Sequence, residues 1–147
     1  MSLSQKITED LKLAMKARDE LRISCLRMIK TSMKNKQVEL GHPLDDDEIQ
    51  AIISSQIRKG KESVEEFDRG GRKDLVEKEE NEIRILYEYL PEQIPLDQIE
   101  KNLKEIISEV GAENLKDLGK VMKVAMTRMT GKVQGREVNE IAKRLLG

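Results

Sequence analysis

The segment LKDLGKVMKVAMTRMTGKVQGR, residues 115–136, combines a helical apolar pattern with a row of cations. The apolar residues recur at steps of three and four, as on the buried face of a helix; they are Leu115, Leu118, Met122, Ala125 and Met129, with Val121 beside them. The cations outside that face are Lys116, Lys120, Lys123 and Arg128. A turn with two glycines and two more cations, Lys132 and Arg136, follows. The segment therefore predicts a helix over 115–129 with a basic outer surface.

Gly119 lies in the first turns of this predicted helix. A glycine there lets another group approach the backbone closely. One interpretation is a phosphate that meets the amides of the helix start and Lys120. A close crossing of two helices is the other interpretation.

Charge is unevenly distributed along the chain. The net charge is −1, yet residues 114–147 contain eight basic and three acidic side chains, while residues 91–113 contain two and six. A local basic face can attract a polyanion even when the whole chain is slightly acidic. An ordinary solvated helical face explains the same pattern.

Helical periodicity extends over the rest of the chain, and no stretch alternates as a strand would. We predict an all-α protein with four helices in residues 1–92 and three in residues 93–147. The boundary follows from Pro91 and Pro95, which cannot continue a helix and bias the residues before them to an extended backbone.

Two acidic residues are predicted helix caps in the first part of the chain, and a third follows a glycine pair. Asp19 precedes the second helix, and Asp45 with Glu48 forms a capping box before the third. Asp74 is expected to cap a fourth helix that continues to Leu90. Gly60 lies on the apolar stripe of the third helix and predicts a close helix crossing.

The second helix is a further basic surface. Between residues 22 and 38 it has no acidic residue and five cations, Arg22, Arg27, Lys30, Lys34 and Lys36.

Composition excludes several classes of protein. Charged and apolar residues are each 37% and are mixed periodically, as in a folded soluble chain. The only aromatic residues are Phe67, Tyr87 and Tyr89, so a surface that stacks unpaired bases is not expected. A single cysteine excludes disulfide frameworks and multi-cysteine zinc sites, and favours a reducing, cytoplasmic setting. No apolar run approaches the roughly 18 residues of a membrane span, so no membrane role is indicated.

No residue pattern predicts a catalytic, metal or cofactor site. His42 stands between Gly41 and Pro43 and is interpreted as a turn residue. Cys25 has no histidine in its pattern and is interpreted as a core residue. The acids at 45–48 are explained by charge at a helix start, because the glycine and oxygen spacing of a metal loop is missing.

Residues throughout the chain resemble the YqeY family. They are Arg58, Lys59, Glu62, Ser63, Phe67, Arg72, Asp74, Leu75, Glu79, Glu82, Leu86, Tyr89, Leu90, Pro91, Gln93, Asp117, Gly119, Val121, Met122, Gly131, Gly135 and Leu145. The region after Pro95 also resembles the tail domain of GatB, the B subunit of the tRNA-dependent aspartyl/glutamyl amidotransferase. Gln134 departs from the pattern, at a turn position where a small or acidic residue is expected.

This GatB/YqeY resemblance implies a two-domain helical fold whose C-terminal domain is similar to a module that contacts tRNA. The motif positions are Gly119, Lys120, Met122, Lys123, Gly131 and Lys132. The amidotransferase reaction belongs to other parts of that enzyme, so a carbon-nitrogen ligase activity with glutamine as amide donor would be inherited by association only.

Three hypotheses follow. The first is a non-catalytic, monomeric accessory protein of translation that binds tRNA through Lys116, Gly119, Lys120, Lys123, Arg128, Lys132 and Arg136. The second is an adaptor that docks amidotransferase subunits or an aminoacyl-tRNA synthetase, with incidental basic faces. The third, an amide-forming ligase, requires an ATP site and an ammonia source.

Overall fold

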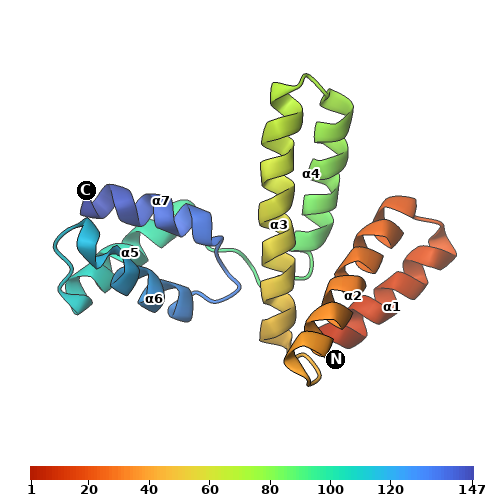
Figure 1. Ribbon diagram of the computed structural model, residues 1–147, viewed down its shortest axis with the longest axis horizontal. Coiled ribbons are helices and arrows are strands. Elements are labelled where there is room, and N and C mark those ends of the chain that lie inside the picture. The colour runs from red at the N-terminus through yellow and green to blue at the C-terminus, as the bar shows by residue number, and fades with distance from the viewer. The chain divides into compact units, whose positions relative to one another are not determined.

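The computed structural model describes all residues, Met1–Gly147, and confirms the prediction of an all-α protein. It contains seven α-helices, one short 3₁₀ helix and no strand. The chain forms two compact units, Met1–Pro91 and Glu92–Gly147 (Figure 1), which are described separately below.

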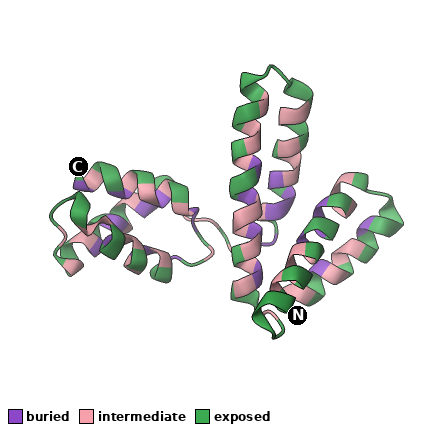
Figure 2. Ribbon diagram, in the orientation of Figure 1, coloured by how far each residue is buried: buried purple, intermediate pink, exposed green.

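The first unit consists of two helical hairpins (Figure 1). Helices α1 (Leu3–Ala17) and α2 (Glu20–Leu40) form one, and α3 (Asp46–Arg69) and α4 (Lys73–Tyr87) form the other. Their core is mostly isoleucine and leucine. Figure 2 shows the buried positions of these helices in purple. The buried residues are Ile7, Cys25, Leu26, Ile29, Ile49, Ile53, Ile57, Ile83, Ile85, Leu86 and Tyr89.

The predicted caps of α2 and α3 are confirmed. The Asp19 carboxylate accepts a hydrogen bond from the backbone N–H of Arg22 at 3.2 Å. Asp45 accepts from the backbone N–H of Glu48 at 2.8 Å, and the Glu48 side chain accepts from the backbone N–H of Asp45 at 3.1 Å. This reciprocal pair satisfies two donors that would otherwise be unpaired at the helix start.

The prediction for α4 was wrong at both ends. The N-cap residue is Arg72, and Asp74 lies inside the first turn, where its carboxylate binds the Arg72 side chain at 3.1 Å. At the other end α4 stops at Tyr87, and Tyr89 and Leu90 donate to carbonyls three residues back. Such bonds tighten the last turn of a helix, and here they do so just before Pro91.

Gly60 marks a close crossing of α3 and α4, as predicted. A β-carbon at Gly60 would lie 3.0 Å from Cγ1 of Ile83 and 3.2 Å from Oε1 of Glu79. Glycine is therefore the residue that allows this approach.

The second unit consists of α5 (Leu96–Val110), the 3₁₀ helix η1 (Leu115–Asp117), α6 (Leu118–Arg128) and α7 (Gly135–Leu146). The three α-helices enclose a separate apolar core. Its buried residues are Ile99, Leu103, Ile106, Val121, Ala125, Met129, Val133, Val138, Ala142 and Leu146.

The prediction of one helix over 115–129 was partly wrong. Residues 115–117 form η1, and the α-helical part ends at Arg128. Leu115, which was expected in the core, is 52% exposed. The Asn114 side chain accepts a hydrogen bond from the Lys116 backbone N–H at 3.0 Å, which favours a separate turn before α6.

Candidate nucleic-acid interface

Helix α6 separates an apolar face from a basic one. Val121, Ala125 and Met129 follow one another at steps of four and are buried in the core of the second unit. Lys120 and Lys123 lie three residues apart on the opposite side of the helix and are exposed. The core contacts of α6 therefore orient these two lysines to solvent.

Lys116 extends this face by one turn toward the chain start. It lies in η1, four residues before Lys120, and is exposed. Lys116, Lys120 and Lys123 form no ion pair, and we refer to them as the α6 basic row.

Asp117 is an acidic side chain beside this row. Its carboxylate accepts the Glu113 backbone N–H at 2.9 Å, and that bond, with the Asn114 backbone and the nearby charge of Lys120, lowers the pKa of Asp117. The acid is therefore ionised at neutral pH and offsets part of the charge of Lys120.

Two other predicted contact residues are paired with acids inside the second unit. Arg128 lies on the flank of α6 next to the core and forms an ion pair with Glu109 of α5, which lowers the pKa of Glu109. Arg136 forms an ion pair with Glu140 one turn later on α7, at 3.5 Å. Because an acid is already paired with each of these arginines, each should attract an external anion less strongly than a lysine of the α6 basic row does.

Lys132 lies in the turn between α6 and α7, and its side chain is exposed. Gly131 has a left-handed backbone with φ of 74°, and its carbonyl accepts from Nε2 of Gln93 at 2.9 Å. The Lys132 carbonyl accepts from the Ile94 backbone N–H at 2.8 Å. The segment that precedes α5 thus fixes the turn that presents Lys132.

Gly119 faces open space. A β-carbon built there would meet no atom within 4 Å, so the interpretation of Gly119 as a helix crossing was wrong. The open backbone at the start of α6 is compatible with the other interpretation, a close approach of phosphate.

Gln134 is a buried polar residue of the second unit. Its sequence position indicated only a departure from the family pattern. It is the N-cap residue of α7 and is 7% exposed, yet its side chain makes no capping bond and its Nε2 has no partner. An unpaired buried amide costs stability. It lies within the second unit, not on the α6 basic row.

The residues considered for nucleophilic or acid-base catalysis do not form a reactive centre. Cys25 is 1% exposed, and burial raises the pKa of its thiol to about 12. His42 is exposed in the turn between α2 and α3, as predicted. No group of three or more His, Cys, Asp or Glu side chains is arranged to hold a metal ion.

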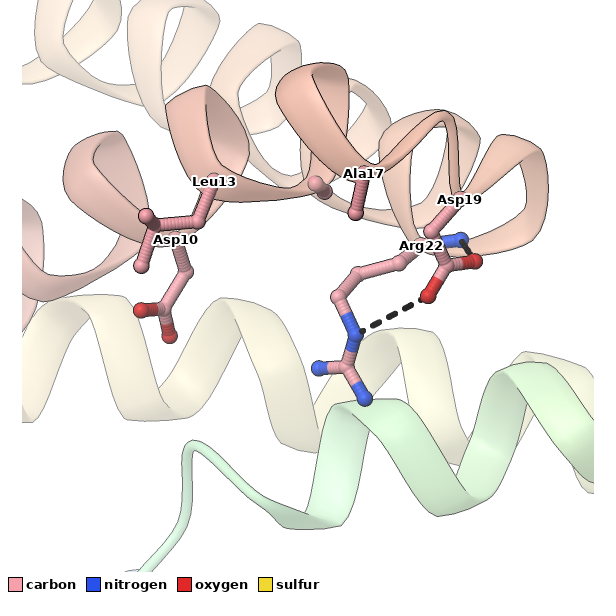
Figure 3. A pocket seen from close by; sticks show the side chains of 6 residues that line it. Asp10, Leu13, Ala17, Asp19 and Arg22 are labelled. Atoms are coloured by element: carbon pink, nitrogen blue, oxygen red, sulfur yellow. Dashed lines mark hydrogen bonds and ion pairs between the residues drawn. The ribbon is translucent and has the colours of Figure 1, made fainter.

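A hollow of about 310 Å³ lies beside the turn between α1 and α2 (Figure 3). The residues that line it are Asp10, Leu13, Ala14, Ala17, Asp19 and Arg22. The charges are already engaged. Asp10 accepts from the Tyr89 hydroxyl at 2.7 Å, and Arg22 pairs with Glu88 at 2.9 Å and with Asp19 at 3.6 Å. These bonds tie the end of α4 to the first hairpin.

The sequence model of a family described as "Yqey-like protein" matches residues 4–146. The chain belongs to the YqeY family. This membership covers both units.

Relatives in the YqeY family include yeast proteins named "Altered inheritance of mitochondria protein 41, mitochondrial". The protein of Lachancea thermotolerans is 36% identical over 112 residues, which are 74% of this chain and 59% of that protein. The protein of Kluyveromyces lactis is 39% identical over 84 residues, 56% of this chain and 45% of its own length. The protein of Saccharomyces cerevisiae is 34% identical over 102 residues, 67% and 55% respectively. The chain thus matches about half of each relative's length.

These names correct the expectation of a cytoplasmic location, because the relatives are named as mitochondrial proteins. The expectation rested on a single cysteine, and a low cysteine count indicates only that the chain does not need disulfides. It does not distinguish one reducing compartment from another. No helix is both long enough and apolar enough to cross a bilayer.

Proposed function

We propose that this YqeY-family protein is a non-catalytic accessory protein that binds tRNA through its second unit. We place this role in the mitochondrion, because the yeast relatives are named as mitochondrial proteins. The observation that carries the proposal is the α6 basic row. Its three lysines are exposed and form no ion pair. Lys120 and Lys123 lie on α6 opposite the side that is buried in the core, and Lys116 lies in η1 just before α6.

The chemistry of this surface suits a phosphate backbone. Lysine acts as a point charge toward phosphate and does not read base edges in the way that a bidentate arginine does. No aromatic residue is present in the second unit, so stacking of unpaired bases does not contribute. The protein would therefore recognise the shape and charge of folded RNA.

The test is binding of fluorescently labelled bulk tRNA, measured by anisotropy at 50 mM and 150 mM salt. If about four to six phosphates are engaged, affinity falls steeply between the two conditions. The triple variant Lys120→Glu, Lys123→Glu, Lys132→Glu should bind at least tenfold more weakly at 50 mM salt while its circular dichroism spectrum is unchanged. Absence of binding by the unaltered protein at 50 mM salt would reject the proposal.

A matched control separates this surface from the effect of net charge. Lys59, Lys73 and Lys101 are exposed lysines on α3, α4 and α5. Their change to glutamate alters the net charge by the same amount and should leave tRNA binding near that of the unaltered protein. Equal losses in the two triple variants would show that only overall charge matters.

The adaptor hypothesis predicts a different result. An adaptor of an amidotransferase or synthetase retains its protein partner after ribonuclease treatment. An RNA-binding protein loses the proteins that are held to it only through RNA. Affinity capture with and without ribonuclease distinguishes the two.

A further inference from the structure

A second basic face lies on the first unit, where α1 and α2 pack side by side (Figure 1). Arg27, Lys30 and Lys34 of α2 recur at steps of three and four and share one side of the helix. Lys30 donates to the Thr8 hydroxyl of α1 at 3.2 Å, which places this side of α2 next to α1. We refer to Lys12, Arg27, Lys30 and Lys34 as the N-terminal basic face.

Lys12 belongs to this face by its position on α1. It follows Thr8 by one turn, and Arg27 precedes Lys30 by about one turn on the antiparallel α2. Lys12 and Arg27 therefore lie at the same level of the hairpin. Both are exposed, as is Lys34.

The charge of this face is not neutralised within the unit. Lys12, Arg27 and Lys34 form no ion pair, and the partner of Lys30 is a hydroxyl, which carries no charge. Two other cations of α2 differ in this respect, because Arg22 pairs with Glu88 and Lys36 with Glu39. Glu9, an exposed residue three positions before Lys12, is the acid nearest to the face along α1.

Lys12, Arg27 and Lys34 make no ion pair within the first unit, and only Lys30 links α1 and α2 by a hydrogen bond. The apolar side of α2 supplies Cys25, Leu26 and Ile29 to the core, and α3 meets another side of α2, where Gln56 donates to the Ser32 hydroxyl at 3.1 Å. Lys12, Arg27 and Lys34 are exposed beside the contact of α1 and α2, whereas Lys30 is partly buried in it. Cations that stay unpaired on a defined side of a hairpin are available to an external polyanion.

We propose that the N-terminal basic face binds the phosphate backbone of double-stranded RNA, independently of the α6 basic row. Arg27 and Lys34 are seven residues apart, which is about 10 Å along a helix. A strand of B-form DNA advances about 3.4 Å per phosphate, and a strand of A-form RNA advances somewhat less, so this length faces about three to four successive phosphates. Lys12 adds a fourth charge from the neighbouring helix.

A membrane surface is the less suitable partner. Helices that lie on membranes insert a continuous apolar face with Trp, Phe or Leu. The solvent side of α2 near the cations carries Ser24, Thr31 and Asn35, while its apolar side is already used in the core. Met28 and Val38 are exposed on this part of α2, but they are ten residues apart and form no continuous apolar face.

The test uses the full chain and a 24-base-pair RNA duplex as probe. In the variant Lys12→Gln, Arg27→Gln, Lys34→Gln, the slope of log affinity against log salt should fall by about two to three, and affinity at 50 mM salt by at least tenfold. Lys30 is left unchanged to keep its bond to Thr8. The control variant Lys59→Gln, Arg69→Gln, Lys73→Gln removes three positive charges elsewhere in the first unit. Its affinity at 50 mM salt and its salt slope should equal those of the unaltered protein.

A conservative variant and a second probe complete the experiment. Lys12→Arg, Arg27→Lys, Lys34→Arg keeps the charges and should bind duplex RNA as the unaltered protein does. Unchanged affinity and slope in the glutamine variant would overturn the inference, as would loss of binding to vesicles with 30% phosphatidylserine while RNA binding is kept. Because the α6 basic row stays intact in this variant, its result does not depend on the tRNA proposal. Failure of that proposal would appear in the binding of tRNA by the unaltered protein and by the Lys120, Lys123 and Lys132 variant.

Discussion

Two glycines in helices face opposite surroundings, and this difference determines what a methyl group would do at each. At Gly60 a β-carbon would come within 3.0 Å of the Ile83 side chain, which is buried in the core and cannot retreat freely. At Gly119 it would enter open space. Both helices would gain the better helix propensity of alanine.

We therefore expect opposite signs for the two changes. Gly119→Ala should raise the free energy of unfolding by about 0.5 kcal/mol, since only propensity changes. Gly60→Ala should lower it by about 1 kcal/mol, because α3 and α4 must separate slightly and overpacking outweighs propensity. Urea denaturation followed by circular dichroism measures both. Stabilisation by both alanines to the same extent would contradict the proposed role of the α3–α4 crossing.

Sequence alone separates these two glycines only in part. Gly60 lies on a long apolar stripe, which indicates that a neighbouring helix covers it, and the structure confirms this. Gly119 also stands among apolar residues, but the chain turns through η1 just before it and leaves it uncovered. The unpaired amide of Gln134 has no sequence signal of its own, because whether a glutamine finds a partner depends on residues that only the fold brings near.

Helix starts carry the clearest local information in this chain, and α3 is the best example. Asp45 and Glu48 exchange two hydrogen bonds with each other's backbone N–H groups. Asp74 of α4, by contrast, lies one residue inside the first turn and binds the side chain of Arg72. Both acids follow a turn that contains glycine, yet only Asp45 is a cap.

Asp45→Ala should therefore lower the free energy of unfolding by about 1 kcal/mol, through loss of the cap at the start of α3. Asp74→Ala should have a clearly smaller effect, because the main partner of Asp74 is the exposed side chain of Arg72. Thermal denaturation of both variants in the same buffer compares them. An equal loss in the two variants would show that Asp74 acts as a cap in solution.

The end of α4, just before Pro91, differs from the end that the sequence predicts. The apolar pattern of α4 continues through Tyr89 and Leu90, and both do contact the core of the first unit. They do so from a tightened turn and not from the helix itself. Periodicity reports which side chains are buried, whereas the end of a helix depends on backbone bonds that periodicity does not encode.

At the scale of the whole molecule, each compact unit encloses its own apolar core. The family membership and the helical class follow from the sequence, since they rest on repeated patterns over the full chain. The presence of two basic faces also follows from composition. Which cations remain unpaired does not, because Arg128, Arg136 and Arg22 form ion pairs with acids on the same helix or elsewhere in the same unit.

We predict that residues 93–147 fold without the first unit. This segment contains ten buried apolar residues of its own core, and domains of about 55 residues do fold alone. It also keeps Gln93 and Ile94, whose bonds to the Gly131 and Lys132 carbonyls hold the turn before α7.

A shorter fragment provides the matched control for this prediction. Residues 97–147 lack those two bonds and should melt at a lower temperature, although α5, α6 and α7 are nearly complete in both fragments. Circular dichroism melting curves of the two fragments and the full chain measure the difference. Because the segment before α5 contributes bonds to the turn of Lys132, the longer fragment should also bind tRNA more tightly than the shorter one at equal helicity. A longer fragment that shows no cooperative melting would mean that the second unit depends on the first for its stability.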